Sequence, residues 1–329
     1  MIIFADVHLR EESADTVLNE VLPGIYQACV ERKDFQAACL GDLLHFRYKI
    51  DARIQNALKD EFRRWNDAGI QLRIIPGNHD QYDVSGRNAL EIFDEMKNVL
   101  VYSQPTWDKD GLWIPYRKNT DVMQVALQTA FSANQAVPQS VLFLHHGVQG
   151  SWMNDNIQDK EGLPLSLFGD FWQTILCGHY HKHQKVGKNL WYIGSPWQTN
   201  ANEANQTKGY AVWDGKILTP EIKRWGPRFH CFELIPGQEL DLTGVEARDE
   251  VRVKVIGVGA NAAAEKIGQQ LAERGVAKHV VTPEIEAMQA RLAVPDGATV
   301  AQYAQAYVTQ FETDLNKERL MKVYGELAQ

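Results

Sequence analysis

Short apolar runs alternate with helix-like patterns over the first two hundred residues. Runs of this length that end at polar or turn residues are typical of strands buried inside a sheet. Strands that alternate with helices along a chain predict an α/β fold. The predicted strands are residues 2–5, 37–40, 72–75, 141–144 and 174–177.

Two helices are predicted between the first three strands. Apolar side chains recur at helical spacing over residues 17–28, and we expect Pro23 and Gly24 to kink or split this helix. The second helix runs from about residue 51 to residue 67, with Asp51 as its N-cap.

From Lys185 onward the pattern becomes that of antiparallel hairpins. Apolar alternation predicts strands at residues 191–193, 209–213 and 217–222, and Asp214-Gly215 supplies a turn between the last two. A strand, a helix and a strand are then predicted at residues 251–255, 262–272 and 279–281, followed by one or two amphipathic helices over residues 299–327.

These patterns divide the chain into three predicted parts. Residues 1–225 form the main α/β domain, residues 226–290 a small α/β capping domain, and residues 291–329 a C-terminal helical segment. A chain of 329 residues is long enough for a large domain and a smaller one.

A block of polar side chains follows each of the five predicted strands. In layered α/β folds, functional sites are built where strands end. Alternate residues leaving a strand point the same way, so we expect Asp6 and His8 to bind one ion together. The blocks are Asp6-Val7-His8, Gly41-Asp42, Gly77-Asn78-His79-Asp80, His145-His146 and Gly178-His179-Tyr180-His181.

Any one of these blocks alone is a weak signal, because a lone histidine is more often a core residue than a ligand. Five blocks at five strand ends predict a metal site. Mixed oxygen and imidazole ligands suit divalent manganese, iron, zinc or magnesium better than a structural zinc site, which prefers thiolates.

The five blocks resemble the motifs of the calcineurin-like metallophosphoesterases, which follow the order DxH, GD, GNHD or GNHE, H and GHxH. The resemblance implies a two-sheet α/β sandwich with helices on its outer faces. Within the superfamily the sequence looks like the nuclease subunits of the SbcCD type, which act in double-strand-break repair and phage recombination. The features that indicate this are Gly41-Asp42-Leu43-Leu44-His45, Asp80 at the end of the third block, and the stretch from Tyr192 to Trp197 with Glu203 and Lys208-Gly209 after it.

The resemblance also implies a role for each polar block. Asp42 bridges two metal ions, and the other ligands divide between them. The implied ligands are Asp6, His8 and His181 for one ion, and Asn78, His145 and His179 for the other. Two such ions lower the pKa of a shared water and stabilise both oxygens of an in-line displacement.

Four further residues have roles that depend on the same resemblance. His79 is the expected proton donor to the leaving oxygen, and Asp80 is expected to orient its ring. Adjacent histidines leave one ligand ambiguous; we choose His145, because His146 falls where relatives often carry glutamine. His45 is expected either to handle DNA or simply to pack against the site.

Basic residues near two of the blocks are candidate DNA contacts. Arg47 follows the second block, and Lys182 and Lys185 follow the last. The alternative is that they are ordinary solvated charges at a helix start and a hairpin.

The formal net charge of −8 argues against a broadly basic nucleic-acid-binding surface. It describes the whole surface, however, and bound cations can reverse the local charge of one cleft. Four scattered cysteines without a CxxC pair argue against a disulfide framework. With no leader or membrane span in the pattern, we expect a cytoplasmic protein, in a bacterial cell or in a host cell if the source is a phage.

The leading hypothesis is a DNA nuclease that favours manganese, with magnesium, iron or zinc as alternatives. It is expected to be a double-strand exonuclease and single-strand endonuclease that acts as a homodimer with an SMC-like coiled-coil ATPase. The C-terminal segment is the expected docking element for that ATPase. A phosphatase or cyclic-nucleotide phosphodiesterase with small substrates is the alternative. A non-catalytic scaffold would have lost ligand positions, and none is missing.

The pattern Gly257-Val258-Gly259 also fits a loose dinucleotide fingerprint, but no carboxylate ends the next strand, so a tight turn explains it better.

Overall fold

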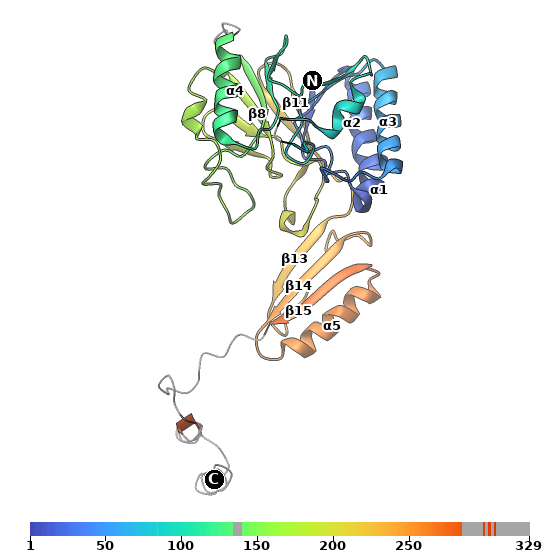
Figure 1. Cartoon of the computed structure of the whole chain (residues 1–329). Helices are drawn as coiled ribbons and strands as arrows, with labels where there is room; N and C mark the ends of the chain where they lie inside the picture. The colour runs from blue at the N-terminus through green and yellow to red at the C-terminus, as the bar shows by residue number, and fades with distance from the viewer. Residues whose placement is uncertain (84, 134–139, 285–298, 300–301, 304–305, 307–329) are drawn as a thin grey trace, which may run out of the picture. The chain divides into compact units, whose positions relative to one another are not determined.

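The computed structural model describes residues 1–83, 85–133, 140–284, 299, 302–303 and 306. In this part of the chain, two six-stranded sheets and one three-stranded sheet form the framework (Figure 1). Their strands are β1 (Ile2–Phe4), β2 (Gln36–Cys39), β3 (Gln71–Ile74), β4 (Val99–Val101), β5 (Thr106–Trp107), β6 (Leu112–Ile114), β7 (Val141–His145), β8 (Thr174–Gly178), β9 (Gln184–Val186), β10 (Leu190–Tyr192), β11 (Lys208–Trp213), β12 (Leu218–Lys223), β13 (Phe229–Leu234), β14 (Glu250–Ile256) and β15 (Lys278–Glu284).

Both large sheets have a parallel centre. The first has the order β12-β11-β1-β2-β3-β4, in which β1 to β4 pair in parallel and the β11–β12 hairpin pairs antiparallel to β1. The second has the order β5-β6-β7-β8-β10-β9, with β6, β7, β8 and β10 parallel. Parallel strands end at the same edge, so each sheet brings several carboxyl ends together.

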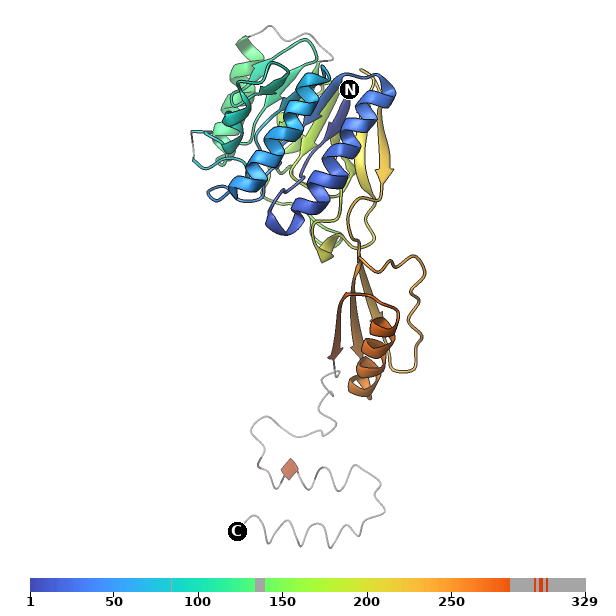
Figure 2. The same ribbon diagram turned by 90° about the vertical axis from the view of Figure 1, so that its right-hand side faces the viewer.

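Helices cover the outer faces of the two sheets. Helices α2 and α3 lie over the first sheet and α4 lies over the second (Figures 1 and 2). Side chains of α2 and α3 pack on the first sheet, and Met123 and Leu127 of α4 pack on the second. The predicted α/β sandwich with outer helices is therefore confirmed. The helices are α1 (Ala14–Thr16), α2 (Leu22–Arg32), α3 (Ala52–Asp67), α4 (Thr120–Ala133) and α5 (Ala260–Glu273), with short turns at η1 (Glu11–Ser13), η2 (Val17–Val21), η3 (Ala89–Phe93), η4 (Leu165–Leu167) and η5 (Ala201–Glu203).

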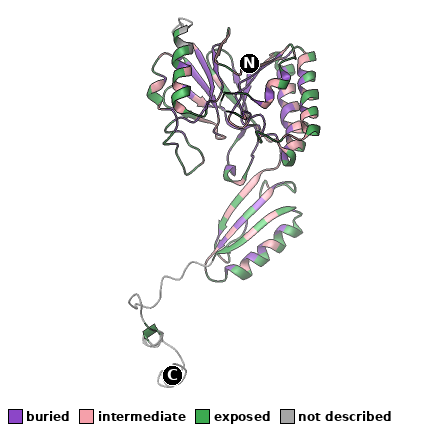
Figure 3. Cartoon of the chain, in the orientation of Figure 1, coloured by how far each residue is buried: buried purple, intermediate pink, exposed green. Residues whose placement is uncertain are grey.

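Strand β1 shows why the buried strands read as continuous apolar runs. Ile2 and Phe4 point into the core beneath α2 and α3, whereas Ile3 points into the core between the two sheets. Because both faces are covered, every position must be apolar, as in other parallel sheets. Burial colouring shows these central strands as buried along their length (Figure 3).

The predicted kink at Pro23-Gly24 appears as a change of helix type. Residues Val17–Val21 form a π-helical turn, and α2 begins directly after it with Pro23 in its first turn. Proline has no N–H to donate and tolerates the first helical turn, so the irregular segment precedes it. The second helix agrees with its prediction, because Asp51 Oδ1 accepts the N–H of Arg53 at 2.7 Å.

The third sheet, β13-β14-β15, and helix α5 correspond to the strand–helix–strand pattern predicted after residue 250. Gly257 and Gly259 lie in the turn between β14 and α5, both at positive φ, as a tight turn requires. The chain divides into two compact units, whose bounds differ from those of the predicted domains. One unit comprises Met1–Cys231, Leu242–Arg252 and Ala272–His279, and the other comprises the remaining described residues. The domain boundaries predicted at residues 225 and 290 stay predictions.

Several elements were not predicted, including β4, β5, β6, β9, β13 and α4. Most of these strands have two or three residues, which is too short for a periodicity to be recognised. The helices predicted over residues 299–327 lie almost entirely outside the described residues.

Within the described ranges, no helix is both long enough and apolar enough to span a bilayer. All four cysteines are free, and three of them are buried. Burial raises the pKa of the Cys29 thiol to about 12, so this thiol stays protonated and packs as a small apolar side chain.

Phe143 and Trp113 are register partners on β7 and β6 of the second sheet, and their stacked rings are expected to stabilise the core between the two sheets. Their rings lie parallel at 7°, with centroids 3.8 Å apart, and both side chains are fully buried. Replacing Phe143 by alanine should lower the free energy of unfolding by about 3–5 kcal/mol. Urea unfolding measures this, with Ile217→Ala as the control because Ile217 is 64% exposed. Equal stability of the two variants would contradict this account of the core.

Candidate metal centre

The five polar blocks lie where the central strands of both sheets end. Asp6 and His8 follow β1, Asp42 follows β2, and Asn78 follows β3. In the second sheet, β7 ends at His145 itself, whose register partner on β8 is Gly178, the residue before His179. The topology therefore brings side chains from distant parts of the sequence to one edge of the sandwich.

Left-handed backbone conformations aim several of these side chains. Asp6, His8 and Asp42 have φ of 55°, 53° and 53°. The strand-like alternation that we expected for Asp6 and His8 is therefore wrong, although the two side chains do converge. Backbone hydrogen bonds hold the turn: Asp6 N–H donates to Gly41 O at 2.9 Å, and His8 N–H donates to Asp42 O at 3.0 Å. Non-glycine residues in this region are strained, and such strain clusters at functional sites.

Two glycines let the backbone approach the buried carboxylate and imidazole. A Cβ on Gly77 would lie 2.2 Å from Asp42 Oδ1, and a Cβ on Gly178 would lie 2.0 Å from the carbonyl oxygen of Leu40. No side chain fits at either place. The glycines of these motifs therefore serve close packing around the ligands.

The first ligand group consists of Asp6, His8 and His181, with one ligand atom of each within 4.8 Å of the others. The Nε2 atoms of His8 and His181 are 2.9 Å apart. The carboxylate of Asp6 accepts the N–H of His179 at 3.0 Å, and burial raises the pKa of this carboxyl to about 6.

The second group consists of Asp42, His145 and His179, again within 4.8 Å. Asn78 joins it, because its Oδ1 lies 3.1 Å from His145 Nε2 and 2.8 Å from His179 Nδ1. The amide oxygen and the two ring nitrogens thus converge on one point.

The carboxylate of Asp42 faces both groups. Its Oδ2 lies 3.8 Å from His8 Nε2 and 3.4 Å from His145 Nε2, so a single oxygen is placed between the two sets. Its Oδ1 accepts the backbone N–H of His79 at 2.8 Å, which fixes the orientation of the group. This position suits a bridging ligand.

The protonation pattern of the histidines fits divalent cations. His145 Nδ1 donates to Leu40 O at 2.6 Å, and His181 Nδ1 faces Glu203 Oε1 at 2.6 Å. Each contact holds a proton on Nδ1, so Nε2 is the ring nitrogen that is available to a cation in each ligand group. Lone pairs and carboxylates that converge in a buried space repel one another unless positive charge lies between them.

A buried cluster that was not assigned a role from the sequence supports His181. Glu203 Oε2 lies 2.7 Å from Lys208 Nζ, and both side chains are about 95% buried. Lys208 also donates to the carbonyl of His181 at 2.9 Å. Burial opposes ionisation, but His181 and Lys208 together lower the pKa of Glu203, which therefore remains a carboxylate. The spacing of Glu203 and Lys208 after the last histidines was the signal available in the sequence.

Asp80 was expected to orient the His79 ring, but in the part of the chain that the structure describes its carboxylate makes no hydrogen bond to that ring. The expected orienting role is therefore wrong. His79 Nδ1 lies 2.7 Å from the carbonyl oxygen of His45, so a backbone group orients the ring. The fully buried carboxylate of Asp80 accepts the N–H groups of Leu44 and Gly77, each at 2.9 Å. Asp80 thereby ties the loop after β2 to the loop after β3. A buried carboxylate must satisfy its oxygens, and the nearest unpaired donors are backbone amides.

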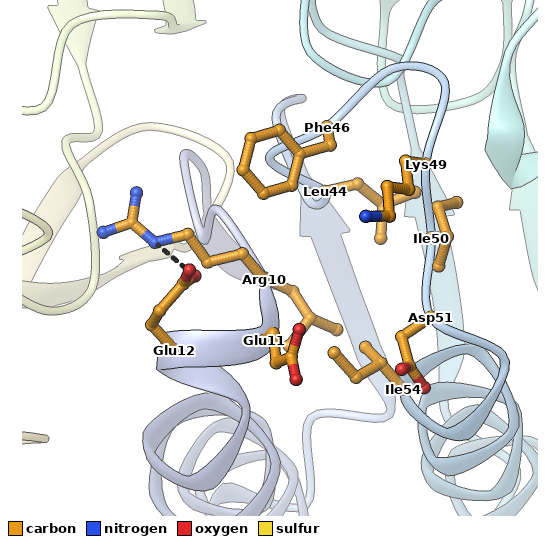
Figure 4. Close-up of a pocket in the computed structure, with 10 residues that line it drawn as sticks. Arg10, Glu11, Glu12, Leu44, Phe46, Lys49, Ile50, Asp51 and Ile54 are labelled. Carbon is orange, nitrogen blue, oxygen red and sulfur yellow. Dashed lines mark ion pairs between the residues drawn. The ribbon is translucent and has the colours of Figure 1, made fainter.

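His45 lies inside the centre, together with a residue that the sequence did not suggest. Its Nδ1 is 3.2 Å from His8 Nδ1, and its ring stacks on His79 with centroids 5.2 Å apart. Arg10 Nη1 lies 3.3 Å from His45 Nε2. Burial, followed by the charge of Arg10, lowers the pKa of His45 to about 4, so the ring is neutral. A pocket of about 190 Å³, called the ligand pocket below, is lined by several of the proposed metal ligands and by Arg10. Arg10 also lines a larger neighbouring pocket, where its guanidinium pairs with Glu12 (Figure 4).

The remaining candidates lie outside the ligand groups. His146 directs its ring nitrogens to the carbonyl oxygens of Gly147 and Arg117, at 2.9 and 3.2 Å, whereas His145 faces the centre. Lys182 pairs with Asp155 at 2.7 Å, and Lys185 lies 5.2 Å from the centroid of the Trp191 ring. Arg47 lines a pocket that also contains Asn78. Of the four proposed DNA contacts, His45 and Arg47 are therefore those next to the ligands.

Two comparisons with known proteins agree with this geometry. The model of the calcineurin-like phosphoesterase family matches residues 1–210. The sequence is also 28% identical over 207 residues to Exonuclease subunit 1 of Enterobacteria phage T4. That alignment covers 58% of this chain and 57% of the phage protein, so the chain spans little more than half of its relative. The resemblance inferred from the five motifs is confirmed.

Metal binding should become tighter as the pH rises. Burial disfavours a charged His145, but Asp42 outweighs it and raises the pKa of the ring to about 9. Below that pH the metal-free ring holds a proton that a ligated cation must displace, so affinity increases until the proton is lost. Titration calorimetry with Mn²⁺ in two buffers of different protonation enthalpy should detect proton release at about pH 7. An affinity that is equal at about pH 6 and about pH 9 would contradict this ligand assignment.

Glu203→Gln should weaken metal binding by about 10- to 100-fold, because the neutral amide no longer orients His181 or raises its basicity. Manganese titration measures the loss, and thermal unfolding monitors the effect of leaving Lys208 buried without its carboxylate. Glu95→Gln is the matched control, since Glu95 is exposed. If Glu203→Gln unfolds at a lower temperature but binds manganese as tightly as Glu95→Gln, Glu203 serves stability only.

Proposed function

Because the family match covers residues 1–210, the chain belongs to the calcineurin-like phosphoesterase family, and we propose that it is a DNA nuclease that uses two divalent ions. The observation that carries this proposal is the position of Asp42. One carboxylate oxygen lies within 4 Å of an imidazole from each ligand group. An isolated ion would need only one of these groups.

The two ions are assigned to the ligands that the structure groups together. Asp6, His8 and His181 would hold one, and Asn78, His145 and His179 the other, with Asp42 shared. When bound, such ions supply positive charge to the phosphate and lower the pKa of the attacking water. Manganese is the proposed metal, since mixed oxygen and imidazole ligands suit it; magnesium, iron and zinc are the alternatives.

His79 is the proposed proton donor to the leaving oxygen. The carbonyl of His45 holds one proton on Nδ1, so the proton exchanged with substrate is the one on Nε2. The ring borders the ligand pocket and is only partly buried, which leaves it accessible to a bound phosphodiester. Its backbone N–H holds Asp42 at the same time, and this fixes the distance between the acid and the bridging ligand.

The charge of the metal-loaded centre is compatible with a phosphate substrate, although the protein as a whole is acidic. Two divalent ions outweigh the two carboxylates of Asp6 and Asp42, and the histidine ligands are neutral when they bind metal. The centre then carries a net positive charge, which favours a phosphate that gains negative charge in the transition state. Arg10 adds a further cation at the rim of the pocket.

DNA is the proposed substrate because the aligned phage protein is named an exonuclease subunit. We extend this to double-strand exonuclease and single-strand endonuclease activity. The word subunit also supports an assembly, for which we propose a homodimer acting with an SMC-like coiled-coil ATPase. Residues 226–290 are proposed to position DNA and residues 291–329 to dock on the ATPase.

His79→Ala should reduce manganese-dependent cleavage of linear duplex and single-stranded DNA by about 10²- to 10⁴-fold, while manganese binding stays unchanged. The loss reflects the missing proton donor. Lys59→Ala is the control, since Lys59 is exposed on α3 and lies outside the ligand groups and the proposed DNA-positioning region. The proposal fails if the wild-type protein, alone or with its ATPase, shows no metal-dependent cleavage of DNA.

A competition experiment separates the nuclease from an enzyme for small phosphate esters. Both would hydrolyse a chromogenic phosphodiester, so that activity alone decides nothing. Strong inhibition of this turnover by long DNA, with little inhibition by mononucleotides, is the expected result. Equal inhibition by mononucleotides at the same nucleotide concentration would favour the small-substrate enzyme.

A further inference from the structure

A pocket rich in tyrosine adjoins the candidate metal centre. It shares Asn78 with the ligand groups and encloses about 150 Å³. This is less than the roughly 300–1,000 Å³ of pockets that hold drug-sized ligands. Its walls include three tyrosines, Tyr48, Tyr82 and Tyr116, and two cations, Arg47 and Lys118. The pocket therefore combines aromatic faces with positive charge beside the proposed position of a phosphate.

Tyr116 fixes the position of this pocket relative to the metal ligands. Its ring stacks on His179 at an interplanar angle of 18°, with centroids 6.3 Å apart, and on His146 at 24° and 5.3 Å. The inner wall of the pocket is thus built on a proposed ligand ring. A group that binds there is held in a defined place relative to the metals.

Tyr48 is the exposed wall of the same pocket. It lies in the loop between β2 and α3 and is 80% exposed, the largest exposure of any tyrosine in the described chain. A large aromatic ring in water buries little area in the fold, so core packing does not explain its position. Arg47 precedes it in the loop, and Lys118 follows Tyr116 by two residues.

The charges in this pocket favour a polyanion. Asp83 is the carboxylate among the lining residues, and its Oδ1 already accepts N–H groups from Ser85 and Arg87 at 2.9 and 3.1 Å. The larger pocket that Arg10 also lines differs, because three carboxylates, Glu11, Glu12 and Asp51, outnumber its two cations, Arg10 and Lys49 (Figure 4). A nucleic-acid strand would meet less repulsion in the tyrosine-rich pocket.

From these observations we infer that the tyrosine pocket binds a nucleobase next to the phosphate that is cleaved, with that base withdrawn from its stack. The inference rests on the proposed nuclease function and adds to it a substrate preference for unpaired strands. Aromatic side chains stack on any base, whereas Arg47 and Lys118 meet the adjoining phosphates. A paired base inside a duplex could not enter a pocket of this size.

Tyr48→Ala tests the inference with the full-length protein and manganese. Cleavage of a single-stranded oligonucleotide should show a KM that is about 5- to 100-fold higher, because one stacking surface is lost. Tyr48→Phe keeps the ring and should remain within about twofold of the wild type. Phe35→Ala is the matched control, since Phe35 is 47% exposed and precedes β2 at the opposite end of that strand.

Oligonucleotides that carry one abasic residue at successive positions make the test specific to a base. For the wild type, KM should rise when the abasic residue lies beside the cleaved bond, whereas Tyr48→Ala should show no additional loss there. An unchanged KM for Tyr48→Ala, or the same abasic penalty in both proteins, overturns the inference and leaves the nuclease function standing. Absence of metal-dependent DNA cleavage by the wild type would instead remove the function on which the inference rests.

Discussion

The buried carboxylate of Asp42 is the constraint on which the rest of the site depends. Burying a charge without a partner is costly, and Asp42 is 2% exposed. His79 N–H holds one of its oxygens, and the other lies between the two ligand groups. The strained backbone at Asp42 and the absence of a side chain at Gly77 both make room for this arrangement. Positive charge between the ligands relieves the cost, which is why the geometry points to metal ions.

The sandwich supplies the rigid support that this arrangement needs. Parallel strands of two sheets end at one edge, and their apolar side chains are buried on both faces. Contacts outside the ligand groups orient three imidazoles of the site: Leu40 O faces His145, Glu203 faces His181, and the carbonyl of His45 faces His79. Such partners hold the tautomer and the orientation of a ligating ring. The site therefore sits on the best-buried part of the fold.

Much of the fold and the identity of the polar blocks could be predicted from the sequence because these strands are buried on both faces. A run such as residues 2–5 must be apolar throughout and stops abruptly at Asp6. The contacts around the blocks could not be predicted. Asp80 turned out to bind backbone amides rather than the His79 ring, and Arg10 reaches His45 through folding that no local spacing encodes. Strands as short as β5 also leave no periodic pattern.

The proposed two-metal centre requires that the carboxylate of Asp42 bridges both ions at the edge of the sandwich. Crystals of the protein soaked in Mn²⁺ and measured at the manganese absorption edge test it most directly. Two anomalous peaks roughly 3.5–4 Å apart are expected, with the carboxylate of Asp42 in contact with both. A single peak at saturating manganese, or two peaks of which only one contacts Asp42, would contradict it.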